Sequence, residues 1–305
     1  MMQLPNVIKV RGSLSMNTPL TRYNTWGLNG CAEYLYQPQD LDDLRVFLKQ
    51  LEASIPVTYI GLGSNLLIRD GGVTGVVIVT HACLKNIEYR DSSNVYVQAG
   101  VACAKLAKFT INKGLTGIEF MAGIPGTVGG ALAMNAGAFG GQTWDYVDYV
   151  DVINRQGEVY SRKVAEYQFA YRQVSIFEDE YFVGAHFTLK QNSEQENTVY
   201  IRELLARRSE TQPIGKKNCG SVFKNPDNAY AAELIEKCGL KGYRIGGASI
   251  SEKHANFINN DADASAEDIE ALMEHVQQKV WEKFSIRLEP CLLYTSDAAD
   301  EEAGG

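Results

Sequence analysis

The sequence predicts an α+β fold of two or three domains. Its 305 residues are enough to bury a full core, and 45% of them are hydrophobic. Segments with helical periodicity and short β-rich runs are mixed along the chain without regular alternation. Glycine clusters separate several of these segments, as is typical of loops between helices and strands.

The first part of the chain predicts both element types. Periodic leucines predict a surface helix over 41–51, with Asp40 as its N-cap. Two β-rich runs, 57–60 and 76–79, then enclose a glycine-bearing loop. A second helix is expected over 101–115, ended by Gly114. Residues 145–164 alternate as a β-hairpin that turns around Arg155, Gln156 and Gly157.

The last part predicts three helices and a tail. A helix from Val199 stops before Pro213, where we place a domain boundary. A short helix over 229–239 and a long amphipathic helix over 265–284 follow. Ser265 and Asp268 form the capping box of the long helix. The acidic tail 291–305 has nothing to continue a core, and we expect it to be disordered.

Composition excludes several classes of function. The net charge of −8 disfavours a nucleic-acid partner. The six cysteines form no CxxC pair and the four histidines show no ligand spacing, so no metal site is expected and a reducing compartment fits. The uncharged run 120–144 is long enough for a membrane span, but its proline and glycines are poor helix formers. With no apolar leader segment either, we expect a cytoplasmic protein.

Two glycine-rich loops are the first candidates for a ligand site. AGIPGTVGGALAMNAGAFGG, residues 122–141, offers peptide N–H groups that an anion could approach closely, or forms a tightly packed turn region. GLGSNLLIRDGG, residues 61–72, follows a predicted strand, but Leu66 stands where a dinucleotide fingerprint has its third glycine. Alone, the second loop favours a plain tight turn. Together the loops suggest two walls of a groove for an extended anionic cofactor.

Polar residues in two further segments are candidates for chemistry. CGSVFKNP, residues 219–226, places Ser221 near Lys224 and Asn225, either as a small polar pocket or as a capped turn before a helix. Cys219 is more consistent with a buried thiol than with a nucleophile. Arg172 stands in an otherwise apolar predicted strand, where it is either paired or available to bind a carboxylate.

Taken in order, these motifs resemble one enzyme family, the UDP-N-acetylenolpyruvoylglucosamine reductases of peptidoglycan synthesis. The resemblance covers roughly residues 20–290 and rests on NTWGLNG, the two glycine loops, YRQVSIF, RRSETQP, GSVFKNP, LIEKCGLKGYRIGGASISEKHANFINN and RLEP. The short connection between Phe177 and Gln212 is similar to the branch that lacks an extra tyrosine-bearing loop.

The resemblance implies a two-subdomain FAD-binding fold of the vanillyl-alcohol-oxidase/PCMH type, followed by a smaller α+β substrate-binding domain. The implied parts are FAD-binding subdomains over 1–85 and 86–212, the substrate domain over 213–290 and the atypical tail. FAD would lie between the two subdomains, with its pyrophosphate on the glycine loops. The implied cofactor residues are Gly61, Gly63, Ser64, Asn65, Leu66, Ile124, Pro125, Gly126, Gly129, Gly130, Asn135, Ala136 and Gly137.

The implied activity is that of UDP-N-acetylmuramate dehydrogenase, the reduction of UDP-N-acetylenolpyruvoylglucosamine to UDP-N-acetylmuramate by NADPH through FAD. By resemblance, Arg172 stabilises the carboxylate charge that develops when hydride reaches the enolpyruvyl ether, and Ser221 protonates the enolate carbon. Lys224 and Asn225 match positions that line the substrate pocket. The protein is expected to act as a monomer, without membrane or nucleic-acid partners.

One departure from the family pattern affects the expected activity. The family usually ends in LEPEV, whose second glutamate is the third catalytic residue, but here RLEP is followed by Cys291. Glu289 lies two residues earlier, about 6 to 7 Å along an extended strand, which is too far to replace it without a shift of the strand. We expect residues 291–305 not to be the natural end and turnover to fall by about 10² to 10³. The alternatives are a catalytically impaired flavin- and UDP-sugar-binding protein, or a flavin oxidase of the same fold, which often tethers its flavin through a histidine that neither loop has.

Overall fold

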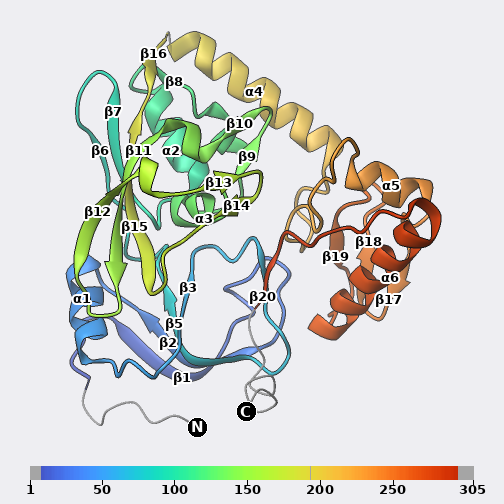
Figure 1. Cartoon of the computed structure of the whole chain (residues 1–305), viewed down its shortest axis with the longest axis horizontal. Coiled ribbons are helices and arrows are strands. Elements are labelled where there is room, and N and C mark those ends of the chain that lie inside the picture. Colours follow the sequence, from blue (N-terminus) through green and yellow to red (C-terminus); the bar gives the residue numbers. More distant parts are fainter. Residues whose placement is uncertain (1–7, 193, 295–305) are drawn as a thin grey trace. The chain divides into compact units, whose positions relative to one another are not determined.

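The structure, a computed structural model, describes residues 8–192 and 194–294 (Figure 1). They fall into two compact units. Unit 1 takes residues from 1–16, 34–62 and 75–208, and unit 2 takes residues from 17–33, 63–74 and 209–305. The chain therefore passes between the units five times. The predicted division at 85 and 212 into three domains stays a prediction.

Three strands near the start of the chain cross the division between the units. The four-stranded sheet has the order β1-β2-β5-β3, built from β1 Ser13–Pro19, β2 Cys31–Gln37, β3 Val57–Ile60 and β5 Val73–Val79. Strands β3 and β5 pair in parallel. Helix α1, Leu41–Gln50, begins at the predicted N-cap, because the Asp40 carboxylate accepts from the Asp43 N–H at 2.9 Å.

Unit 1 contains a five-stranded antiparallel sheet of order β12-β11-β15-β7-β6. Its strands are β6 Ile87–Tyr89, β7 Asn94–Gln98, β11 Val147–Asn154, β12 Val159–Lys163 and β15 Glu180–Thr188. Strands β11 and β12 form the predicted hairpin, with Gly157 at φ +72 in its turn.

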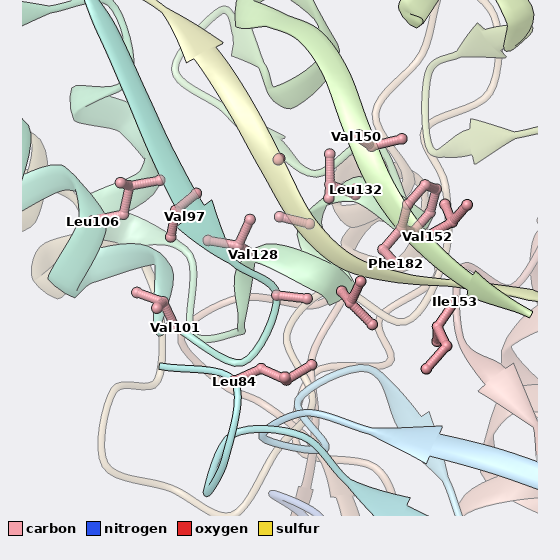
Figure 2. Close-up of a cluster of buried hydrophobic side chains, with 14 of the residues drawn as sticks. Leu84, Val97, Val101, Leu106, Val128, Leu132, Val150, Val152, Ile153 and Phe182 are labelled. Atoms are coloured by element: carbon pink, nitrogen blue, oxygen red, sulfur yellow. The ribbon is translucent and has the colours of Figure 1, made fainter. Parts of the chain in front are cut away.

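The core of unit 1 lies between this sheet and helices α2, Cys103–Ile111, and α3, Val128–Ala133. Val97, Val150 and Phe182 from three strands gather with Leu106 and Leu132 from the helices (Figure 2). Each such burial contributes about 1.5 to 3 kcal/mol.

The remaining elements of unit 1 are short, apart from one helix. They are β8 Leu115–Thr116, η1 Glu119–Gly123, β9 Gly137–Ala138, β10 Gly141–Gln142, η2 Thr143–Tyr146, η3 Val164–Glu166, β13 Phe169–Ala170, β14 Gln173–Val174 and β16 Lys190–Gln191. Helix α4, Glu194–Thr211, continues past Arg208, the last residue of the unit, and stops before Pro213 as predicted.

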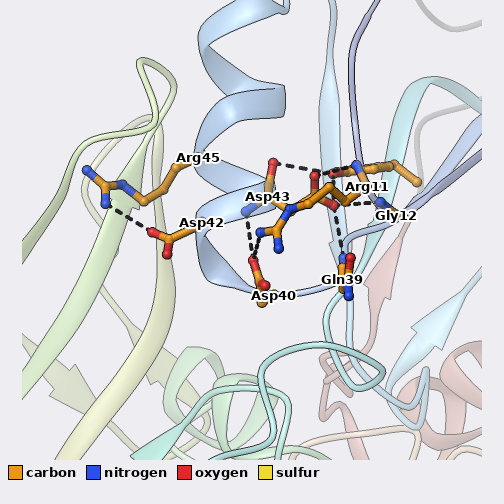
Figure 3. A network of polar contacts seen from close by, with 8 residues as sticks. Arg11, Gly12, Gln39, Asp40, Asp42, Asp43 and Arg45 are labelled. Atoms are coloured by element: carbon orange, nitrogen blue, oxygen red, sulfur yellow. Dashed lines mark hydrogen bonds and ion pairs between the residues drawn. The ribbon is translucent and has the colours of Figure 1, made fainter.

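A buried carboxylate anchors the chain before β1 to helix α1 (Figure 3). Asp43 accepts from the backbone N–H groups of Arg11 at 2.7 Å, Gly12 at 2.8 Å and Gln39 at 3.0 Å, and from the Tyr36 hydroxyl at 2.7 Å. Burial alone would raise the pKa of Asp43, but these four donors outweigh it and hold the pKa below its ordinary value.

Unit 2 is a smaller α+β layer. Strands β17 Arg244–Ile245, β18 Ala248–Ile250 and β19 Ile258–Asn260 form an antiparallel sheet, and helices α5 Ala231–Lys237 and α6 Ala266–Phe284 complete the layer. The predicted capping box of α6 is present. Trp26 is fully buried in this core, and its indole N–H donates to Ile258 O at 2.8 Å.

The start of the expected tail differs from the prediction. Cys291 and Leu292 are 8% and 7% exposed, and β20, Leu293–Tyr294, pairs in parallel with β4, Leu66–Leu67. Leu292 packs into the core of unit 2, whereas Leu293 is 45% exposed and is held by its strand pairing, although acidic residues follow both in the sequence. Residues 295–305 lie outside the described part. Within the described ranges, no helix is both long and apolar enough to span a membrane.

Candidate active site

The two predicted glycine loops meet in unit 1 at Gly61. This residue directly follows β3, and a Cβ on it would lie 2.3 Å from Thr127 Oγ1. Only glycine fits such a close approach. Thr127 is the N-cap of α3, which the sequence rule of a threonine before a helix could have identified.

Peptide N–H groups are available where these loops meet. The N–H groups of Gly61, Leu62, Gly126 and Thr127 donate to no acceptor in the part of the chain that the structure describes. Successive free N–H groups on glycine-rich backbone fit the oxygens of a phosphate or pyrophosphate. The cofactor expected from the sequence therefore fits these residues.

Other glycines of the stretch 122–141 serve internal packing, as the alternative interpretation proposed. A Cβ on Gly129 would lie 3.0 Å from Ala99 Cβ, and one on Gly137 would lie 2.4 Å from Gly141 O. The Gly129 N–H is also used, because it donates to Ala99 O at 2.8 Å. A Cβ on Gly130 would have no neighbour nearer than 3.7 Å, so that position is open. Ile124, Pro125 and Ala136 lie in unit 1 with these glycines.

Arg172 does not lie in a strand, and that expectation is wrong. It occupies the turn between β13 and β14 with φ +55, a left-handed conformation. From there its Nη1 donates to Asn135 O at 3.1 Å and its Nη2 donates to Gly137 O at 2.5 Å. The structure thus joins Arg172 to the glycine stretch, 35 and 37 residues earlier in the chain. The Tyr171 ring lies 5.2 Å from the guanidinium carbon.

The other end of the glycine loop 61–72 belongs to unit 2. A Cβ on Gly63 would lie 1.9 Å from Tyr23 O, and Gly63 has φ +63, so both space and backbone require glycine. The N–H groups of Gly63, Ser64 and Asn65 have no acceptor among the described residues. The Asn65 side-chain amide donates to Cys291 O at 2.8 Å, and Leu66 pairs with Leu293.

Ser221 is exposed on a segment that pairs with the C-terminal return of the chain. The Cys291 N–H donates to Val222 O at 2.9 Å, and Cys291 Sγ donates to Ser221 O at 2.8 Å. The Asn256 side chain bonds both backbone groups of Phe223, at 2.8 and 2.9 Å. Sequence reasoning gave Asn256 no such role.

The two predicted substrate residues, Lys224 and Asn225, both contact other groups of the protein. Asn225 Oδ1 accepts from the Ala231 N–H at 3.1 Å and so satisfies the start of α5, as in the capped-turn alternative. Lys224 Nζ lies 3.5 Å from Glu289 Oε2, and the Glu289 side chain is 72% exposed. Burial raises the pKa of Cys219, which keeps its thiol protonated and supports the interpretation as an inert thiol.

Unit 2 also contains a cavity of about 520 Å³ that is lined in part by one face of its sheet. Arg244, Ser249 and Asn259 are cross-strand partners and share this face. Asp261 accepts from Ser249 Oγ at 2.6 Å and pairs with Arg244 at 3.1 Å. The complete lining is Ser209, Pro213, Ile214, Lys216, Gly242, Arg244, Ser249, Ile250, Ser251, Glu252, Lys253, Asn259 and Asp261, with three cations and two carboxylates. No cluster of potential metal ligands occurs among the described residues.

Comparisons with known proteins match most of the chain, including both glycine loops and the C-terminal return. Residues 32–162 match the family model of an FAD binding domain, and residues 212–293 match that of the UDP-N-acetylenolpyruvoylglucosamine reductase C-terminal domain. The UDP-N-acetylenolpyruvoylglucosamine reductase of Legionella pneumophila (strain Corby) is 49% identical over 288 residues, 94% of each chain. That of Coxiella burnetii (strain Dugway 5J108-111) is 47% identical over 94% of this chain and 97% of its own. The crystal structure of the Thermus caldophilus reductase superposes with a TM-score of 0.80 at 30% identity, over 94% of this chain and 100% of that one.

Proposed function

Since this chain belongs to the family of UDP-N-acetylenolpyruvoylglucosamine reductases, we propose that it reduces UDP-N-acetylenolpyruvoylglucosamine to UDP-N-acetylmuramate in peptidoglycan synthesis. FAD and NADPH are its cofactors. The predicted α+β, FAD-binding fold class is confirmed by the same matches. The observation that carries the proposal is the meeting of the two glycine loops, where Gly61 lies against Thr127 beside free peptide N–H groups.

Unit 1 supplies the groups that suit the flavin and the substrate's charge. FAD, when bound, transfers hydride from NADPH to the enolpyruvyl group. The N–H groups of Gly61 and Thr127 would hold its pyrophosphate, because they lack protein acceptors. Arg172 would hold the substrate carboxylate, since only two of its five N–H donors are used by described residues.

Unit 2 supplies the proton. The Ser221 hydroxyl is exposed, while its backbone is fixed through Val222 and Phe223. Such fixing favours proton delivery to a carbanion-like carbon, because position matters more than acidity for this weak acid. In this proposal Cys291, beside Ser221 O, stands where the family has its catalytic glutamate. The chain then keeps Arg172 and Ser221 but lacks the carboxyl group of that glutamate. We therefore propose slow turnover by the same reaction.

The cavity on the sheet of unit 2 is our proposed site for the UDP part of the substrate. Lys216, Arg244 and Lys253 outnumber the carboxylates of Glu252 and Asp261 around it, which favours a diphosphate. Replacing Arg244 by alanine is expected to weaken the binding of UDP alone by about tenfold, measured by titration calorimetry. Unchanged UDP affinity would place the nucleotide elsewhere.

The proposed setting is a cytoplasmic monomer without nucleic-acid or membrane partners. The acidic composition and the unpatterned cysteines support this setting. Light scattering after size-exclusion chromatography tests the oligomeric state, with 33.7 kDa expected for one chain.

Anaerobic stopped-flow absorbance at the flavin band tests the proposed reaction. NADPH is expected to bleach the FAD-loaded protein, and UDP-N-acetylenolpyruvoylglucosamine is expected to restore the band slowly. A protein that takes up no FAD would overturn the assignment. Bleaching that oxygen reverses but the enolpyruvyl substrate does not, even in the Cys291→Glu variant, would favour the oxidase alternative.

A further inference from the structure

Asn135 lies at the centre of the contacts around Arg172, with only 1% of its surface exposed. Its side-chain Nδ2 donates to Gln142 Oε1 at 2.9 Å and to Ala170 O at 3.0 Å, so both amide hydrogens are used. Its Oδ1 accepts from the Trp144 N–H at 3.3 Å. A ligand therefore finds no free donor on this side chain.

The bond to Ala170 connects Asn135 to the hairpin that carries Arg172. Ala170 is the last residue of β13, and the hairpin turn with Arg172 follows it. A turn residue with φ +55 is costly for any side chain except glycine, so the turn needs support from outside the hairpin. The side-chain amide of Asn135 provides such support.

The backbone of Asn135 contacts the guanidinium itself. Its carbonyl oxygen accepts from Nη1 of Arg172, and the carbonyl of Gly137 accepts from Nη2. Asn135 has φ +40, a conformation that asparagine tolerates better than most residues. This turn in the glycine stretch aims two carbonyl oxygens at the fork of the arginine and fixes its direction.

We propose that Asn135 is a positioning residue for Arg172, acting on both the hairpin backbone and the guanidinium, and that it does not bind the cofactor. Asn135 thereby determines the position at which the Arg172 guanidinium binds the substrate's carboxylate. The inference rests on the proposed function, which supplies that carboxylate. It replaces the expectation that Asn135 is one of the cofactor-binding residues.

Equilibrium binding tests the proposal without turnover. Titration calorimetry on the FAD-loaded protein gives the affinities of UDP-N-acetylmuramate, which carries a carboxylate, and of UDP-N-acetylglucosamine, which lacks that group. The wild-type chain is expected to prefer the first ligand. Asn135→Asp keeps the size but loses both donors, and is expected to reduce this preference about tenfold or more, with FAD affinity unchanged.

Two further variants separate positioning from general damage. Gln142→Leu removes the other acceptor of the Asn135 amide and leaves the bond to Ala170, so the preference should be kept. In an Arg172→Ala background, Asn135→Asp should cause no further loss, because its effect passes through Arg172. An additive loss, or an unchanged preference in Asn135→Asp, overturns the inference. A wild-type chain that binds neither ligand overturns the proposed function instead.

A measurement on the unaltered protein covers the case in which Asn135→Asp does not fold. In a chain labelled with ¹⁵N-arginine, the NMR signals of Arg172 are assigned by their loss in Arg172→Lys. Two carbonyl acceptors should slow rotation of the guanidinium and give separate Nη1 and Nη2 proton signals. A single averaged signal would show that Asn135 and Gly137 do not hold the group.

Discussion

Replacing Cys291 by glutamate should restore the missing acid and speed the oxidative half-reaction. In the structure, Cys291 N–H donates to Val222 O and Cys291 Sγ lies 2.8 Å from Ser221 O. The carboxyl oxygens of a glutamate lie two bonds beyond the position of Sγ, so at this site they would be close to the Ser221 backbone. A group at this position would act next to the proposed proton donor.

The expected gain follows from what one such group contributes to the transition state. Removing a single stabilising group typically costs about 10² to 10³ in rate, or about 2.7 to 4 kcal/mol, so Cys291→Glu should recover a gain of that order. Position 291 is only 8% exposed, and burial would raise the pKa of a carboxyl group there, as suits a proton donor. The same burial should lower the free energy of unfolding by about 1 to 3 kcal/mol.

The assay is a single turnover in which NADPH-reduced protein is mixed with UDP-N-acetylenolpyruvoylglucosamine and flavin reoxidation is followed. Cys291→Gln is the matched control, because it has the size of glutamate without its acid. Faster reoxidation in Cys291→Glu alone supports the reasoning. Equal rates in both variants, or no change from the wild-type chain, would refute it.

Three further predictions concern cofactor binding and stability. Gly61→Ala places a Cβ 2.3 Å from Thr127 Oγ1, and equilibrium fluorescence titration should show FAD affinity reduced at least about tenfold, whereas unchanged affinity would contradict the proposed cofactor loop. Asp70→Ala removes an acceptor for the first N–H groups of α6 and should lower the free energy of urea unfolding by about 1 to 2 kcal/mol. The carboxylate of Asp43, whose pKa is lowered in the folded state, stabilises the protein above its unfolded pKa of about 3.9, and this contribution is lost as pH falls through the folded value. Asp43→Asn should therefore destabilise the protein by about 1 to 3 kcal/mol at pH 7, with a smaller difference in unfolding curves at low pH.

Sequence reasoning succeeded where the signal is local. The caps of α1 and α6 depend on residues within one turn of each helix start, and both were predicted from Asp40 and from Ser265 with Asp268. The fold class followed from ordered motifs that span most of the chain, and the comparisons confirm it.

Contacts between distant parts of the chain gave no such signal. The apolar neighbours of Arg172 favoured a strand, but its left-handed turn is held by carbonyls 35 and 37 residues earlier. The segment after Pro290 is held in place partly by the Asn65 side-chain amide, which donates to Cys291 O and lies 226 residues earlier in the chain. These bonds depend on the tertiary fold, so local propensity could not predict them.

The division of the chain also determines the order in which the molecule can be completed on the ribosome. The core of unit 2 needs Trp26, whose indole N–H donates to Ile258 O and whose carbonyl accepts from Asn260 Nδ2 at 2.9 Å. Trp26 is synthesised more than 200 residues before both partners. Its side chain therefore lacks these hydrogen-bond partners during the synthesis of most of unit 1. A fragment cut at the start of the C-terminal family match would lack Trp26 and leave the buried Asn260 amide without that acceptor.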